Sequence, residues 1–357
     1  MPNPLLGVVF HWLGGLSSAS FYVPYRGVRR WSWEVFWLTG GLFSWLIAPW
    51  AFAAWRTPDL LGVIARTPPH VAGLCVLFGM LWGFGGLTYG LTMRYLGLSL
   101  GMAVVLGLCT VFGTLIPPIA QGQFAAQLLD NVSGRIVLLG LAVTLAGIVV
   151  VAWAGARKDA SLSPQQKAQA VAEFDLRRGI AVAVFSGVMS ACFAFGLAAG
   201  EPIKAIAAAA GAGPLWTGLP ILCLVMFGGL VTNAVWCAIL IVRNRSAGQW
   251  LGRAGPSAEG DQGRMPLLAN YGLCAVAGTA WYLQFFFYSM GESQMGRFGF
   301  SSWTLHMASI IIFGTAWGFY FREWKGASRP IRAMVFAGVG LLVAATVVIG
   351  WGNNLAG

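Results

Sequence analysis

The chain has 357 residues, of which 58% are hydrophobic and only 9% are charged, and its mean hydropathy is +0.73. Soluble globular proteins carry about 25% charged residues, so this composition excludes an ordinary soluble domain and favours an integral membrane protein. The net charge of +11 does not indicate a nucleic-acid partner, because the basic residues lie between apolar runs, as topology signals do.

The six cysteines do not indicate a disulfide framework or a metal site, because all lie inside apolar runs and none has metal-like spacing. We therefore expect no cofactor and no metal. The N-terminus has no basic segment before its first apolar run, so that run is expected to be a spanning helix and not a cleaved signal peptide.

A membrane-spanning helix needs about 20 mostly apolar residues. Ten runs meet this criterion, at about 5–24, 33–55, 71–91, 96–118, 135–154, 179–200, 215–242, 267–290, 303–321 and 331–351. The predicted fold is an all-α integral membrane protein with ten transmembrane helices. The polar insertion 156–178 is expected to be a cytoplasmic linker between two five-helix halves, 1–155 and 179–357.

The distribution of Lys and Arg predicts the orientation. Of 22 basic residues, 17 fall in the odd-numbered loops and five in the even-numbered loops. The five are Arg56, Arg66, Arg135, Lys204 and Arg297. The positive-inside rule then places the odd loops in the cytoplasm and both termini in the periplasm.

The two halves also resemble each other in sequence. Segments with matching residues at matching spacing are 15–21 and 187–193, 79–97 and 278–296, 112–114 and 313–315, and 140–150 and 338–348. Each half contains an odd number of spans, so the halves are expected to lie inverted in the membrane, an arrangement typical of secondary transporters with a site at the repeat interface.

Several motifs are spread along nearly the whole chain: WSWE at 31–34, YGLTMRYLG at 89–97, WYLQFFFY at 281–288, SWTLHM at 302–307 and EW at 323–324. Together these motifs resemble the bacterial L-rhamnose–proton symporter family. The resemblance implies membership of the drug/metabolite transporter superfamily, ten helices in two inverted repeats, and proton-driven uptake of L-rhamnose, with L-lyxose as a second candidate sugar. Segments 244–265 and 291–299 depart from the family pattern.

Ionisable residues inside spanning helices mark pathways or proton relays by default, and His11 and His306 are the two found there. Both are expected in the outer half of the membrane, at depths within about 5 Å of each other. In the fold that the resemblance implies, the first and ninth helices border one cavity. We therefore predict that His306, with His11, loads the coupling proton. The alternative is a neutral histidine bonded to a carbonyl or to a sugar hydroxyl.

The carboxylates are less well placed for coupling. Glu34 is a third candidate for proton coupling at the cytoplasmic start of the second run, where an acidic residue is also favourable for the helix dipole alone. Glu323 is expected to pair locally. Glu201 and Glu292 are expected in outer loops, and no carboxylate pair suited to enzymatic acid–base chemistry is found.

Sugar recognition needs aromatic faces and hydrogen-bonding groups in a mostly apolar pocket. Trp281, Gln284 and Tyr288 share one helix face. These three and four further side chains are the predicted substrate contacts; the four are Trp82, Tyr89, Asn233 and Trp303. Core packing or an interfacial aromatic belt is the alternative.

The sequence thus predicts a bacterial inner-membrane symporter, not an enzyme, whose partners are a small sugar, a proton and the lipid bilayer. A transporter of the same fold for another monosaccharide or metabolite, working as a facilitator or exporter, stays open as an alternative. A role as a receptor or scaffold is a third alternative, which predicts that the protein binds ligand but does not accumulate it across the membrane.

Overall fold

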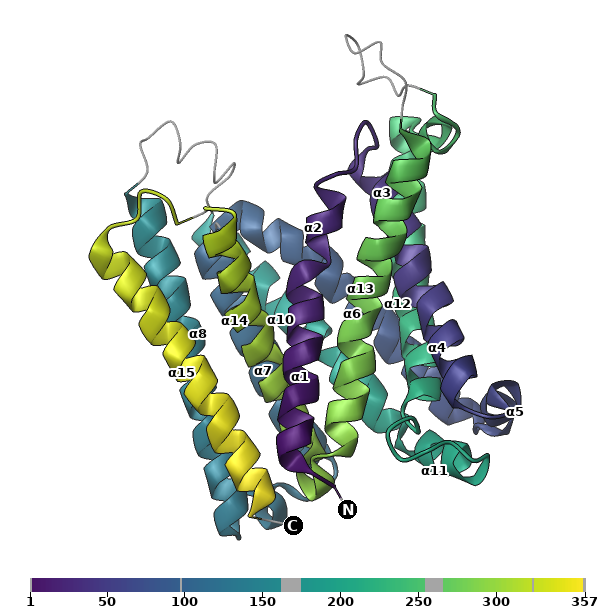
Figure 1. Cartoon of the computed structure of the whole chain (residues 1–357), viewed down its shortest axis with the longest axis vertical. Coiled ribbons are helices and arrows are strands. Elements are labelled where there is room, and N and C mark those ends of the chain that lie inside the picture. Colours follow the sequence, from purple (N-terminus) through teal and green to yellow (C-terminus); the bar gives the residue numbers. More distant parts are fainter. Residues whose placement is uncertain (1, 97, 162–174, 254–265, 323, 356–357) are drawn as a thin grey trace.

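The computed structural model describes residues 2–96, 98–161, 175–253, 266–322 and 324–355, and throughout these residues the chain forms helices and turns with no β-strand. Figure 1 shows long helices that run side by side along the vertical axis of the molecule. Much of the predicted linker 156–178, together with Gly97 and Glu323, lies outside the described residues.

In the first half, a helix or a series of helices occupies each apolar run. The elements are α1 (Pro4–Ser20), α2 (Tyr22–Tyr25), α3 (Trp33–Leu42), the π-helical turn η1 (Phe43–Ile47), α4 (Ala48–Arg56), α5 (Leu60–Arg66), α6 (Pro69–Leu96), α7 (Leu98–Ala120), η2 (Ala125–Leu129) and α8 (Val132–Ala160). The second run is therefore one helical series, α3–η1–α4.

The second half follows the same plan. Its elements are α10 (Leu176–Ala199), α11 (Glu201–Ala209), α12 (Leu219–Asn244), η3 (Ala247–Leu251), α13 (Leu267–Ser293), η4 (Gly296–Ser301), α14 (Ser302–Tyr320) and α15 (Arg329–Asn354). The predicted boundaries differ from these by a few residues. The difference matters in α13, which continues past the predicted end at 290 and so carries Glu292 in its last turn.

Seven stretches of the described chain are long and apolar enough to cross a membrane. They are Pro4–Tyr25, Trp33–Arg56, Pro69–Thr92, Val132–Lys158, Arg177–Ala209, Leu219–Asn244 and Arg329–Asn354. A shorter apolar helix covers Val104–Ala120. α13 and α14 fall outside this set, because the polar and aromatic residues that make them candidate site helices also lower their hydropathy.

Glycines bring α1 unusually close to α13 and α14. A Cβ placed on Gly15 would lie 2.2 Å from Oγ of Ser309, and one on Gly14 would lie 2.9 Å from the carbonyl oxygen of Gln284. Small residues of this kind let membrane helices pack backbone against backbone. The first helix therefore packs between the two helices that carry half of the ten candidate residues.

Both ends of the chain lie at the same end of the bundle, at the bottom of Figure 1, where α5 and α11 also lie. The connection from α2 to α3 lies at the opposite end.

Candidate functional site

A cavity of about 590 Å³ lies where α10 and α11 meet the carboxyl ends of α7 and α13. It is lined by Gly113, Pro117, Pro118, Gln121, Gln127, Ala194, Leu197, Ala198, Glu201, Lys204, Pro214, Thr217, Tyr288, Glu292, Ser293, Gly296, Gly299 and Phe300. This volume is in the range of small-molecule sites. Because α11 lines it, the cavity lies toward the end of the bundle that holds both termini (Figure 1).

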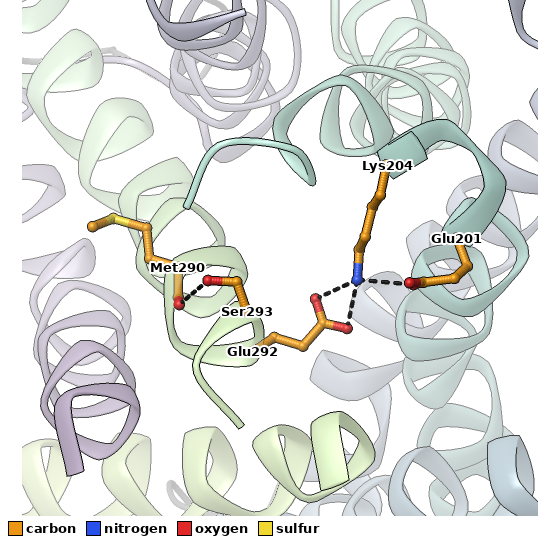
Figure 2. A network of polar contacts seen from close by, with 5 residues as sticks. All are labelled: Glu201, Lys204, Met290, Glu292 and Ser293. Carbon is orange, nitrogen blue, oxygen red and sulfur yellow. Dashed lines mark hydrogen bonds and ion pairs between the residues drawn. The ribbon is translucent and has the colours of Figure 1, made fainter. Parts of the chain in front are cut away.

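A charged cluster forms part of the cavity wall. Nζ of Lys204, on α11, lies 3.1 and 3.2 Å from the two carboxylate oxygens of Glu292, on α13, and 2.8 Å from Oε2 of Glu201. Figure 2 shows the ammonium group between the two carboxylates. Lys204 and Glu292 are only 23% and 21% exposed, whereas Glu201 is 64% exposed. The Lys204–Glu292 pair therefore joins α11 to α13 in a partly desolvated setting.

Two histidines lie together beside the cavity. His11 on α1 and His306 on α14 are fully buried, and their ring centroids are 6.4 Å apart. None of their four ring nitrogens has a hydrogen-bond partner among the described residues. An unsatisfied buried polar group costs about 1–3 kcal/mol, so this arrangement is expensive for a purely structural pair and is typical of a functional site.

Tyr288 connects the cavity with the histidines. Its ring lines the cavity and contacts His11 at 5.3 Å and His306 at 5.4 Å between centroids. The side chain is only 4% exposed. Tyr288 is thus the residue that touches both the space open to a ligand and the two candidate proton carriers.

Backbone contacts hold the histidine pair in place. Oγ of Ser309 lies 2.9 Å from the carbonyl oxygen of His11 and 2.8 Å from that of His306, so one hydroxyl links α1 to α14 at the level of both residues. Gly291 on α13 leaves room for the His11 ring, since a Cβ there would lie 2.7 Å from Nε2. The two rings are therefore positioned by all three helices.

An aromatic cluster packs next to this group. Trp303 stacks on Phe193 at 5.8 Å and contacts Tyr288 at 5.7 Å, and Phe285 contacts Phe193 at 4.2 Å and Trp82 at 5.5 Å. The indole N–H of Trp303 donates to the carbonyl of Cys109 at 3.0 Å. The predicted residue Trp303 is therefore buried against Tyr288, and Trp82 is partly buried against Phe193 and Phe285. Neither tryptophan is among the described cavity lining.

Comparison with known proteins identifies one family over nearly the whole chain. Residues 1–354 match the protein family described as L-rhamnose-proton symport protein (RhaT). Proteins named L-rhamnose-proton symporter are similar over 98% of this chain and 98% of their own length: one from Cronobacter sakazakii is 37% identical and one from Pectobacterium atrosepticum is 36% identical. Another from Yersinia pestis is 35% identical with the same coverage.

The chain belongs to the L-rhamnose-proton symport protein family. It is accordingly a multi-pass membrane transporter and not an enzyme, as the sequence motifs predicted. Within the described residues, no group of three or more His, Cys, Asp or Glu is placed to hold a metal ion.

In this family member the other predicted sugar contacts lie away from the cavity. Gln284 is buried and donates from Nε2 to the carbonyl of Trp281 on its own helix, at 3.0 Å. Trp281 packs on Phe21 at 4.3 Å. Asn233 accepts from the indole N–H of Trp37 at 3.1 Å and donates to the carbonyl of Gly229 at 2.9 Å, so its amide is occupied.

Tyr89 and Glu34 are also placed apart from the histidine pair. Tyr89 packs in a separate apolar cluster with Leu96, Val105 and Ala183. Glu34 is buried at the start of α3 and accepts hydrogen bonds from Asn244 at 3.0 Å and Ser246 at 2.8 Å. Its carboxylate is therefore satisfied by the last residue of α12 and by the loop directly after it.

Sequence reasoning missed Lys204 and Glu292, which were assigned to outer loops. Glu292 lies four residues after Tyr288, so one more helical turn extends the Trp281–Gln284–Tyr288 face to it. A prediction that extended this helix by one turn would have identified Glu292 as a candidate. Its partner is 88 residues away in the chain, and no local pattern pointed to that pairing.

Proposed function

We propose that this protein imports L-rhamnose together with a proton across the bacterial inner membrane, with L-lyxose as a second candidate sugar. The identity of the sugar is supported by the names of full-length relatives. The coupling is supported by one structural observation: His11 and His306 are buried next to Tyr288, which lines the cavity, and their ring nitrogens have no hydrogen-bond partner in the part of the chain that the structure describes. Histidine is the side chain best suited to gain and lose a proton near neutral pH.

We further propose ten spans in two inverted repeats, 1–155 and 179–357. The pattern of helix packing supports this: α1 packs on α13 and α6 on α10, while α8 packs on α15, α3 on α12 and α7 on α14. If each span of one half is replaced by the corresponding span of the other half, the same set of packing pairs results. Chance packing of ten unrelated helices has no reason to follow that rule.

In the proposed orientation both termini face the periplasm. The positions of Arg56, Arg66, Arg135 and Lys204 on the side of the termini, against 17 basic residues assigned to the other side, support it. The cavity then faces the periplasm, where sugar and protons enter.

The proposed transport cycle uses alternating access. L-rhamnose enters the cavity against Tyr288, and a proton binds to the His11–His306 pair. The cluster of Trp303, Phe193 and Phe285 blocks the way beyond the cavity and has to separate before release to the cytoplasm. Rocking of one repeat against the other is the usual way in which inverted-repeat transporters do this.

The test is counterflow of labelled L-rhamnose in proteoliposomes that contain the full chain, with and without an inward proton gradient. Accumulation that a protonophore abolishes is the expected result. Counterflow without gradient-driven accumulation would identify a facilitator and refute the role of the histidines. Flux of another monosaccharide in place of L-rhamnose, in protein that binds and folds normally, would refute the sugar assignment.

A further inference from the structure

The proposed proton site does not include the Lys204–Glu292 pair, and the placement of this pair is unusual for a simple structural ion pair. It lines the cavity, it is about three-quarters buried, and it joins the ends of two helices that are remote in sequence. A buried ion pair is weak evidence for a role in stability, because desolvation of the two charges offsets their attraction. A pair kept at a cavity wall, with polar atoms facing the cavity, is instead a set of hydrogen-bonding groups presented to a ligand.

The charged residues of this wall indicate which class of ligand the cavity can bind. One ammonium group is bracketed by two carboxylates, and these three residues are the charged residues among the described cavity lining. The wall therefore carries a net negative charge, and its cation is already neutralised. An anionic sugar acid or sugar phosphate is disfavoured. A neutral polyol suits the wall, because its hydroxyl groups donate to carboxylate oxygens and accept from an ammonium group.

The lining supplied by α7 and α10 has the opposite character. Pro117, Ala194, Leu197 and Ala198 present apolar surface to the same cavity. The cavity is thus amphipathic, and it fits a ligand with hydroxyl groups on one part and a methyl group on another. A 6-deoxyhexose has this pattern.

We propose that Lys204 and Glu292 bind the hydroxyl groups of the sugar, while the α7 and α10 lining receives its methyl group. The inference rests on the proposed function and assigns the substrate site to this cavity. Glu292 lies one helical turn after Tyr288 on α13. A sugar held by Glu292 therefore lies next to the tyrosine that contacts both histidines, so sugar and proton occupy adjacent sites.

The test compares Glu292→Gln, Lys204→Gln and the double variant with Arg66→Gln as the control. Arg66 forms an exposed ion pair with Asp59 at 3.2 Å, and neither residue is among the described cavity lining. The half-saturating concentration of L-rhamnose in counterflow is expected to rise about tenfold or more in both single variants, which corresponds to about 1.4 kcal/mol, and to change little in the control.

The double variant distinguishes a role of the pair in sugar binding from a purely structural role. It leaves neither buried member of the pair as an unpaired charge, and Glu201, which loses its lysine, is 64% exposed. A merely structural pair would therefore regain wild-type affinity in it. We expect its affinity to stay as poor as in the single variants. Wild-type affinity in the double variant would overturn the proposal. Absence of L-rhamnose counterflow by the wild-type protein would instead refute the proposed function, so the two failures are distinguishable.

A labelling experiment tests the location of the sugar even where a charge variant does not fold. All six native cysteines are buried, so the background for a water-soluble maleimide is low. Thr217 lines the cavity, and Thr217→Cys is expected to react at a rate that saturating L-rhamnose lowers severalfold. An unchanged rate in a variant that still transports L-rhamnose would place the sugar elsewhere and refute the proposal.

Discussion

Gly291→Ala gives the sharpest test of how the histidine pair is held. Gly291 lies in the last turns of α13, and a Cβ there would meet Nε2, Cε1 and Cδ2 of His11 at 2.7, 2.8 and 3.0 Å. Ordinary contacts between such atoms are about 3.5–4.0 Å. The imidazole, or the end of α13, therefore has to move by about 0.5–1 Å.

The net effect on stability follows from two opposing contributions. Replacing a helical glycine by alanine gains up to about 1 kcal/mol, and less near a helix end. Overpacking a tight site costs typically about 1–3 kcal/mol. The variant should therefore lose about 0–3 kcal/mol of stability, while the contact between His11 and Tyr288, now 5.3 Å between centroids, is disturbed directly.

The assay is proton-driven accumulation of L-rhamnose beside counterflow, with thermal unfolding in detergent as the fold check. Gly272→Ala is the matched control, since Gly272 lies on the same helix and a Cβ there meets no atom within 4 Å. We expect Gly291→Ala to accumulate much less sugar than the control at similar protein levels. Equal accumulation in the two variants would refute the argument that the His11 position matters for coupling.

Three further outcomes are expected. His306→Gln should keep counterflow and lose proton-driven accumulation, because glutamine preserves polarity without titrating; continued accumulation would remove His306 from the proton path. Asn233→Leu should lower thermal stability by about 1–3 kcal/mol, since it strands the Trp37 indole N–H, and leave the L-rhamnose KM unchanged; a raised KM would restore it as a sugar contact. Ala198→Ser should shift competition between L-rhamnose and L-mannose toward L-mannose by roughly tenfold, and an unchanged ratio would contradict the apolar methyl site.

The positions of the helices along the chain were predictable because residues that contact the lipid bilayer have to be apolar, and hydropathy measures this property. A run such as 267–290 has to be buried in lipid or protein, and α13 occupies it almost residue for residue. An apolar run does not determine which face of its helix points toward the cavity. Tyr89 and Asn233 were chosen as polar groups in apolar sequence, but their faces point to an apolar cluster and to Trp37.

The candidate site was predictable where its residues are close in sequence, or where two residues were expected at the same depth in the membrane. His11 and His306 were expected at similar depth on neighbouring helices, and their rings lie 6.4 Å apart. Lys204 and Glu292 escaped prediction because each looks like an ordinary loop charge when taken alone. Only the fold, by bending the chain at Gly200 between α10 and α11, brings the lysine over the end of α13.

The end of α13 joins the two proposed binding events. Within its last two turns, Glu292 faces the cavity, Tyr288 contacts both the cavity and the histidines, and Gly291 makes room for His11. A symporter must keep its helices from switching when only one of its two substrates is bound. A sugar that pulls on Glu292 and a proton that changes the charge beside Tyr288 both act on this one helix end, so its displacement depends on both. If the two proposed sites are correct, coupling in this protein needs no long-range pathway, because both sites include residues from the same end of α13.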